Sequence, residues 1–473
     1  MLCRTDRTME YPSVVRLAFV VCFGFLFGCG SHSPSHGALT LPPALKVPPQ
    51  QASEPVAASS APAAAADCAL FPGQARTGET ITSVGLTDRV EPIHAPHPTN
   101  DSERLLFRQL YETLVRVDCE GHAVPGLAIA WRFDGTAKKW MVTLRENARF
   151  SDNKPVTAMD VATSWTGTGS ELRPDVRRLV QSITVVDDQT LEIELQSSRP
   201  DAVLALAHTD LAITGTVPGI PWPLGTRSAT VDSTTASVIT LRHLPENTIT
   251  RFFIAPGRDG RDLLDRGVDL LLTRDPRTLN YAATLTQFQT APLPWQQTHV
   301  LLTPRPQAAF AFSADERRAL AQDAVRGEAR GAEGPFWWES LSECEVDPPQ
   351  APLATPPTPQ ATSRIVYNAD DSAAQELAER LVGIGKYPRA SGLAGTALAQ
   401  ALRRGNESAY ILSLERRPLD PCREIQVLMD NAGWIDPHSI VPLVDTRRQA
   451  IVRRGRQRLT TEWDGIVPLD LRN

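Results

Sequence analysis

Few residues of this chain have the types and spacing that catalysis or metal binding requires. No GxSxG, HExxH, Walker or GxGxxG pattern occurs in a strand–turn–helix context, so the common enzyme signatures are missing. His94 and His97 could ligate nickel or zinc, but Pro96 prevents a helix between them, and no cysteine or carboxylate stands at ligand spacing. We therefore expect no enzyme, no metal site and no cofactor.

Aromatic and basic side chains remain as candidates for ligand binding. Trp295 and Trp434 fall near the expected junctions of two parts of the chain, where an indole could stack on a solute. Burial in a core is the commoner use of tryptophan, and the same alternatives apply to Trp337 and Trp338. A basic stretch near the C-terminus could contact acidic lipid headgroups or form a solvated face; it contains Arg447, Arg448, Arg453, Arg454 and Arg456.

Hydrophobic periodicity predicts that a mixed α/β body positions these side chains. Alternating residues predict a half-buried strand at 140–144, and Asp187-Asp188 between two alternating runs predicts a hairpin. Asp370-Asp371 is expected to cap a helix that ends near Gly383. Further helices are predicted at 103–116, 310–331 and 393–404, and further strands at 363–368, 410–412, 441–444 and 449–452.

Composition excludes a disordered, a fibrous or a polytopic membrane protein. The chain has 473 residues, of which 42% are hydrophobic and 22% charged, as in ordinary globular proteins. Its net charge of −6 gives no global field that would attract nucleic acid. Of its 39 prolines, seven lie in 30–66 and six in 347–360, so both segments are predicted to be linkers.

The N-terminus has the pattern of an export signal. Leu17–Phe27 is apolar, follows three arginines, and is too short for a membrane span of about 20 residues. It ends in Gly28-Cys29, which resembles the bacterial lipobox, whose cysteine becomes lipidated. We therefore expect a signal peptide at 1–28, and lipidated Cys29 with a Pro/Ala/Ser tether at 29–66. The alternative is an ordinary signal peptide cleaved nearby.

Four other cysteines are expected in the exported chain. An oxidising compartment permits disulfides, and proximity in the sequence favours the pairs Cys68–Cys119 and Cys344–Cys422. Four free, buried thiols are the alternative, and no CxxC spacing indicates a zinc or redox site.

Several motifs in order resemble the family 5 extracellular solute-binding proteins, the peptide, dipeptide and nickel receptors of ABC importers. The matching residues are Tyr111–Val115, Val124–Ala128, Trp131, Leu144–Asp152, Val156–Val161 and Trp165. Weaker matches follow, including Pro223–Thr226, Leu263–Asp269 and Asp420-Pro421.

This resemblance implies a two-lobe, type II periplasmic-binding-protein-like α/β fold with a hinge and a discontinuous first lobe. Lobe one would hold 67–293 plus 440–473, and lobe two 294–439. The implied function is capture of a small peptide or similar polar solute for an ABC permease and its ATPase, by a lipid-anchored protein on the periplasmic side of a bacterial membrane.

Departures from the family pattern leave a second function open. Many peptide receptors place a tryptophan and an aspartate before the Asp-Pro motif, where this chain has Leu414 and Arg417. An arginine would attract an anion and repel a ligand's ammonium group, and a solvated loop is the alternative for Arg416-Arg417. The ligand-contact candidates are therefore Arg417, Trp295, Trp434 and Asp420. The alternative is a degenerate member with a structural or partner-binding role, which Arg417, the shortened chain and Arg227 in place of a motif glycine would favour.

Overall fold

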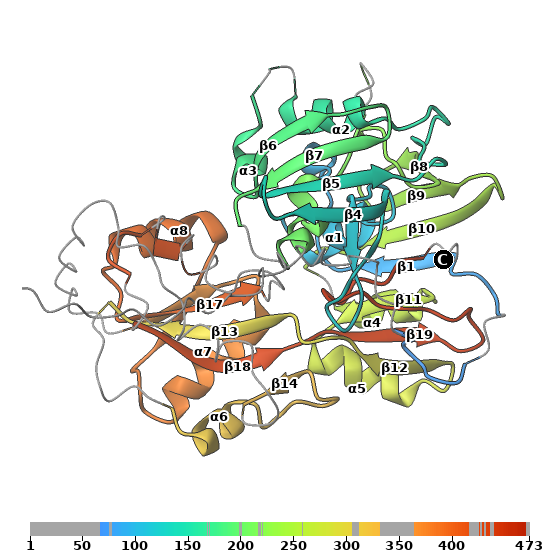
Figure 1. Ribbon diagram of the computed structural model, residues 1–473. Coiled ribbons are helices and arrows are strands. Elements are labelled where there is room, and N and C mark those ends of the chain that lie inside the picture. Colours follow the sequence, from blue (N-terminus) through green and yellow to red (C-terminus); the bar gives the residue numbers. More distant parts are fainter. Residues whose placement is uncertain are drawn as a thin grey trace, which may run out of the picture. The chain divides into compact units, whose positions relative to one another are not determined.

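Two large β-sheets organise the described part of the chain (Figure 1). The computed structural model describes residues 67–74, 78–167, 169, 171–197, 201–215, 219, 221–257, 259–304, 312–331, 364–415, 425, 428–429, 432–435 and 439–469. We call the seven-stranded sheet, of order β12-β19-β11-β1-β10-β9-β8, the first sheet. The second sheet has six strands, in the order β14-β18-β13-β17-β15-β16.

The first sheet is mixed. Its middle strand β1 runs parallel to both neighbours, β10 and β11, whereas the remaining pairs are antiparallel. The strands are β1 (Ser83–Leu86), β8 (Ala229–Thr234), β9 (Val238–His243), β10 (Thr248–Ile254), β11 (Leu270–Thr273), β12 (Phe288–Pro292) and β19 (Gln449–Arg453).

Helices cover both faces of the first sheet. Leu271 and Ile451 pack against α4 (Gly260–Asp265) and α5 (Pro276–Thr284) on one face. The neighbouring residues Leu270 and Val452 point to the opposite face, in the core that also holds residues of α1 (Asp101–Phe107). This alternation is the period-two pattern of a sheet buried on both sides.

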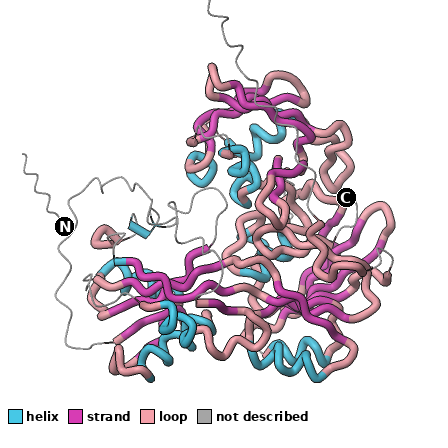
Figure 2. The backbone as a smooth tube through the Cα atoms, turned by 60° about the horizontal axis from the view of Figure 1, so that its bottom comes forward, coloured by secondary structure: helices cyan, strands magenta, loops and turns pink. Residues whose placement is uncertain are grey.

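The second sheet has the same construction. Its strands are β13 (Gln297–Leu302), β14 (Ala329–Arg330), β15 (Ile365–Asn368), β16 (Ala390–Leu393), β17 (Ala409–Glu415) and β18 (Ile440–Thr446). One face packs on α6 (Ala314–Leu320) and α7 (Ser372–Gly383), and the other on α8 (Gly395–Arg404). Strand β15 runs parallel to β16 and β17. Helices therefore cover both faces of this sheet; Figure 2 draws helices in cyan and strands in magenta.

A smaller antiparallel sheet is inserted between β1 and β8. It has the order β4-β5-β7-β6, with β4 (Ala128–Asp134), β5 (Lys139–Leu144), β6 (Val180–Val185) and β7 (Thr190–Leu195). Helices α2 (Ala158–Thr166) and α3 (Pro174–Arg177) contribute to its core, and β2 (Val115–Val117) pairs with β3 (Ala123–Pro125) nearby. The predicted strand at 140–144 and the hairpin around Asp187-Asp188 are confirmed.

Two predicted helices are shorter than expected. The first ends at Phe107, because the next residues form turns and the Leu110 carbonyl accepts the Arg227 N–H instead of continuing a helix. Leu110, Tyr111 and Leu114 are buried, so their spacing reported burial and not helical structure. The helix predicted at 310–331 is limited to α6, and Ala329–Arg330 forms β14 with the second sheet.

The chain passes between the two large sheets through two adjacent segments, 293–296 and 447–448, which we call the crossover segments. The Gln296 N–H donates to Thr446 O over 3.2 Å, and the Leu293 N–H donates to Arg448 O over 3.1 Å. The first crossover joins β12 to β13. The second comes later than expected, because 440–446 pairs with β13 in the second sheet, and only from β19 onward is the chain part of the first sheet.

Candidate functional site

A large cleft, with a volume of about 1060 Å³, lies between residues of the first and the second sheet. Residues that follow the carboxyl ends of β1, β11 and β15 line it, namely Thr87–Arg89, Arg274–Asp275 and Ala369–Ser372. Asp101, Arg104, Asp259, Glu415 and Arg448 complete its charged lining. Each of the three strands has a parallel neighbour, and carboxyl ends of parallel strands are the usual position of ligands in α/β sheets.

Helix caps fix the shape of this lining. Asp275 accepts hydrogen bonds from the N–H groups of Arg277 and Thr278 at the start of α5. Asp371 accepts one from the Ala374 N–H at the start of α7. Aspartate is favoured at this position because its carboxylate satisfies N–H groups that have no partner within the helix. Asp275 and Asp371 therefore fix the backbone at the starts of α5 and α7, at the edge of the cleft.

Asp101 is surrounded by arginines. Its carboxylate lies 3.4 Å from Arg274 Nη2 and 3.6 Å from Arg448 Nη1. Burial alone would raise the pKa of Asp101, but the attraction of Arg448, Arg274 and Arg104 lowers it to about 2. Asp101 is therefore ionised at any physiological pH.

Arg448 is the most deeply buried cation of the cleft. The residue is 3% exposed, and its Nε donates to Gln296 Oε1 over 3.1 Å. Burial lowers the pKa of Arg448, and the attraction of Asp101 opposes that shift. The hydrogen bond to Gln296 ties this guanidinium to the other crossover segment.

Carboxylates on the second-sheet side have their own partners. Asp371 Oδ2 lies 3.1 Å from Nε2 of His299, a side chain that is completely buried. Burial raises the pKa of Asp371, yet His299 and the capped N–H of Ala374 hold that pKa well below its usual range. Glu415, at the end of β17, forms an ion pair with Arg104 of α1, which links the second sheet to the first-sheet side of the cleft.

Asp88 differs from these carboxylates. Its Oδ2 accepts the Ser102 hydroxyl over 2.8 Å, and within the described residues no cation lies at ion-pair distance. Burial raises the pKa of Asp88, with the Ser102 hydrogen bond opposing the shift.

The candidate tryptophans do not line the cleft. Trp295 lies in the first crossover segment, where the guanidinium groups of Arg330 and Arg447 stand 4.4 Å and 4.2 Å from its ring centroid. Trp434 was expected to contact a ligand, but its ring is 6% exposed in the core on the α8 face of the second sheet, and its Nε1–H donates to Leu402 O. Packing accounts for Trp434.

Several other candidates fall outside the described residues. They are Cys29, Trp337, Trp338, Cys344, Arg417, Asp420, Cys422 and the proline-rich segment 347–360. Their predicted roles stay predictions.

The basic stretch near the C-terminus is neither a uniform solvated face nor a lipid-facing patch. Arg447 stacks on Trp295, Arg448 lines the cleft, and Arg453 and Arg456 both lie within ion-pair distance of Asp269. These four arginines therefore have structural partners within the protein, and Arg453 and Arg456 share theirs. Arg227, which replaces a motif glycine, is also buried, and the nearby charges of Glu112 and Glu462 oppose the lowering of its pKa by burial.

Two contacts between a histidine and a carboxylate hold the segment around His94. His94 Nδ1 lies 2.7 Å from Glu103 Oε1, and His97 lies 3.5 Å from Asp210. No group of three or more potential ligand side chains in the described ranges is arranged to hold a metal ion.

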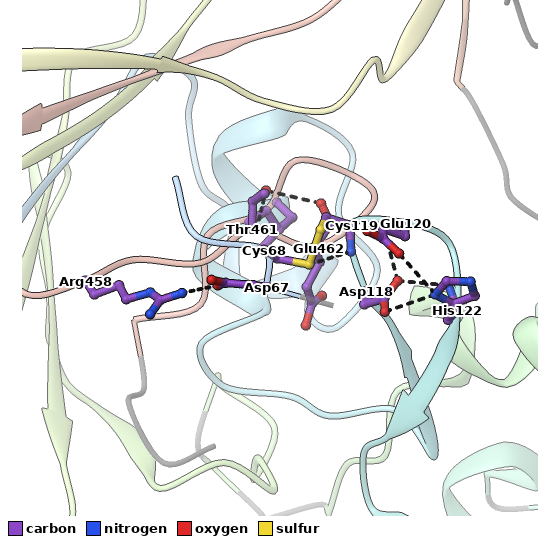
Figure 3. Close-up of a disulfide and its surroundings, with 10 residues drawn as sticks. Asp67, Cys68, Asp118, Cys119, Glu120, His122, Arg458, Thr461 and Glu462 are labelled. Carbon is purple, nitrogen blue, oxygen red and sulfur yellow. Dashed lines mark hydrogen bonds and ion pairs between the residues drawn. A yellow bond between two sulfur atoms is a disulfide. The ribbon is translucent and has the colours of Figure 1, made fainter. Parts of the chain in front are cut away.

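A disulfide fixes the beginning of the described chain (Figure 3). It joins Cys68 to Cys119, the pair that lies close in the sequence. The Thr461 N–H donates to Cys68 O over 3.0 Å, so a C-terminal segment also holds this point. The part of the chain after the predicted tether is thus fastened to the first-sheet side.

The sequence patterns did not reveal Arg274, Arg448 and Asp101 as cleft residues, because these residues are distant in the chain. One available signal was the pattern of a buried strand followed by an aspartate helix cap, as in 270–275 and 365–371. That pattern marks the carboxyl end of a strand and could have located two edges of the cleft.

Comparison with known proteins shows which family part of the chain resembles. The sequence profile of the bacterial extracellular solute-binding proteins, family 5 (middle part), matches residues 122–231. This match covers less than a quarter of the chain, which resembles the family over that stretch. The matched family is one of solute-binding proteins.

Individual relatives agree with family 5 over limited stretches. A binding protein of Haemophilus influenzae is 30% identical over 131 residues, which cover 24% of this chain and 25% of the relative. The periplasmic oligopeptide-binding protein of Salmonella typhimurium is 46% identical over 63 residues, covering 13% of this chain and 11% of the relative. The matched segments therefore span a quarter or less of these curated relatives.

Solved structures share the fold over most of the chain. A Pseudoalteromonas dipeptide-binding protein in complex with Met-Leu has a TM-score of 0.61 at 13% identity, covering 82% of this chain and 99% of that one. The unliganded murein tripeptide-binding protein MppA has a TM-score of 0.53 at 15% identity, covering 83% and 98%. The fold is thus the two-lobe, type II α/β fold expected from the sequence. In the described residues no helix is long and apolar enough to span a bilayer.

Proposed function

We propose that this protein captures a small peptide or similar polar solute in the cleft and presents it to the permease of an ABC importer. The observation that carries the proposal is the cleft itself, about 1060 Å³ in volume, at the carboxyl ends of strands from two sheets. This volume lies at the upper end of the range for small-molecule sites. A cleft filled by its own side chains would instead have favoured the degenerate, structural alternative.

The two lobes would close on the solute by rotation at the crossover segments. The two crossover segments lie side by side, joined by hydrogen bonds at Gln296 and Leu293. They would form a short hinge between two lobes that have separate cores. In this proposal lobe one is 67–293 with the chain after the second crossover, and lobe two is 297–446. Binding shifts the equilibrium toward the closed form because the solute contacts both lobes only there.

Purification with the natural solute tests this function. Native mass spectrometry of the full chain, expressed in a bacterial periplasm and never denatured, should show a bound small molecule that is lost on unfolding. Absence of any adduct, together with no thermal shift across peptide and metal libraries, would favour the structural alternative.

We also propose that Cys29 is lipidated and holds the protein on the periplasmic side of a bacterial membrane. Support comes from the apolar run, Gly28-Cys29 and the tether composition, together with the periplasmic relatives. Cys29→Ala should move the protein from the membrane to the soluble periplasmic fraction. An unchanged membrane fraction would contradict lipidation at this residue.

A further inference from the structure

Two guanidinium groups in the cleft have more donors than the described residues use. A guanidinium carries five N–H donors. Arg448 makes one hydrogen bond, from Nε to Gln296, and its Nη1 is 3.6 Å from Asp101. Arg274 makes one, from Nη2 to Asp101 over 3.4 Å, and its buried Nε has no partner among the described residues. Most of these donors are therefore free to bind a guest in the cleft.

The charge of this pair is also only partly balanced. Arg274 and Arg448 share one carboxylate, that of Asp101. An arginine as buried as Arg448 is costly unless its charge is paired and hydrogen-bonded. Among the described residues, Asp101 is the one carboxylate at ion-pair distance from these two cations, although the cleft as a whole is lined by seven carboxylates and four arginines.

Of the other carboxylates that line the cleft, all but Asp370 are engaged elsewhere, and Asp259 pairs with Arg261. Asp275 accepts the N–H and hydroxyl of Thr278, Asp371 is held by His299, and Glu415 is paired with Arg104. Asp88 accepts the hydroxyl of Ser102. A group from outside the chain is therefore the natural partner for the unused donors.

We propose that the bound solute presents an oxyanion, a carboxylate or a phosphate, to Arg274 and Arg448 beside Asp101, and that these arginines select for it. The inference rests on the proposed function and specifies its substrate class. A guanidinium can donate two parallel N–H groups to two oxygens of an oxyanion. A neutral amide in the place of the oxyanion would lose these charge-assisted hydrogen bonds.

Asp101 has the opposite role to the arginines. Its carboxylate occupies the cations in the absence of a solute and repels an incoming oxyanion. Replacing it with asparagine keeps a side chain of the same shape and removes the competing charge. The proposal therefore predicts effects of opposite sign for neighbouring substitutions, which a merely structural network would not produce.

The test uses the full chain at constant ionic strength, with thermal shift and calorimetry as readouts. The probes are succinate, inorganic phosphate and succinamide, the last as the neutral analogue of succinate. We expect succinate or phosphate, but not succinamide, to stabilise the protein. Arg274→Gln should weaken oxyanion binding about tenfold, as for loss of a charge-assisted hydrogen bond. Asp101→Asn should strengthen it about threefold or more, and the exposed Arg277→Gln should leave it unchanged.

Each outcome decides the matter. A preference for succinate over phosphate, or the reverse, identifies the type of oxyanion and supports the proposal. Equal stabilisation by succinamide, no stabilisation by either oxyanion at about 20 mM, or unchanged binding in a folded Arg274→Gln variant would overturn it. Arg274→Lys keeps the charge but not the fork and should recover part of the affinity. If native mass spectrometry shows an uncharged natural solute, this inference fails and the binding function stands; if it shows none, both fail.

Discussion

The two edges of the cleft are built alike and charged differently. On the first-sheet side, β11 leads into Arg274 and then Asp275, the cap of α5; on the second-sheet side, β15 leads to Asp370 and then Asp371, the cap of α7. The residue before the cap is thus an arginine on one side and an aspartate on the other. Among the described lining residues, all arginines belong to the first-sheet side or the second crossover.

This difference indicates which edge of the cleft would bind an oxyanion first. An oxyanion would bind first to the first-sheet side, and the second sheet would close over it with carboxylates and polar groups. The two capping aspartates also have different side-chain partners. Asp275 accepts a hydrogen bond from the Thr278 hydroxyl over 2.5 Å, whereas Asp371 Oδ2 lies 3.1 Å from Nε2 of the buried His299. The second-sheet cap therefore depends on a buried ionisable pair.

The largest expected effect concerns Trp434, in the core behind the second-sheet edge. Trp434→Ala should lower the free energy of unfolding by about 3–5 kcal/mol, because it removes a buried ring and its hydrogen bond to Leu402. Trp434→Phe should cost less. Urea unfolding measures both, and affinity for the co-purified solute should stay unchanged in the folded variants. A specific loss of affinity would make Trp434 a ligand contact after all.

The His299–Asp371 pair should rank next. His299→Leu removes the buried partner of Asp371 and should lower the free energy of unfolding by about 3 kcal/mol. Adding Asp371→Asn should recover part of that loss, because no unpaired charge then remains. Denaturant unfolding of the three variants checks this, and a loss below about 1 kcal/mol for His299→Leu would show that the pair contributes little.

On the first-sheet side, Asp101 makes stability depend on acid. Its folded-state pKa of about 2 lies below the ordinary 3.8, so the unfolded chain takes up the proton first as pH falls. Its contribution, about 2 kcal/mol, is fully present above about pH 5 and is lost toward pH 2. Unfolding measured from pH 6 to pH 2 should show the wild type converging with Asp101→Asn. A constant difference across that range would contradict this assignment.

The smallest effect should come from the first-sheet cap. Thr278→Val keeps the shape of the buried side chain but removes the hydroxyl that donates to Asp275, at a cost of about 1 kcal/mol. Thermal unfolding beside His299→Leu compares the two edges directly. An equal or larger loss for Thr278→Val would reverse the proposed order of the two caps.

Local patterns predicted the elements whose own residues determine them. The alternation in β5, the hairpin of β6 and β7, and the capped, amphipathic α7 are all found in the structure. The helix predicted at 103–116 ends early because long-range hydrogen bonding, such as that of Leu110 with Arg227, decides the backbone there. Apolar spacing reports burial, and burial also occurs in turns.

The site was harder to predict than the fold. Asp101 and Arg274 are separated by 173 residues, and Arg448 looked like one member of a basic stretch. Only the return of the chain through the second crossover brings these three together. Motifs could indicate the resemblance to family 5, but the charges of the cleft come from residues between and after those motifs.

A crystal structure of the protein purified with its natural solute would test the central claim most directly. The account predicts electron density for a small molecule in the cleft, with an oxyanion at Arg274 and Arg448 and with the second-sheet edge near Asp371 drawn toward it. A cleft without solute, closed by side chains of the protein itself, would contradict the account.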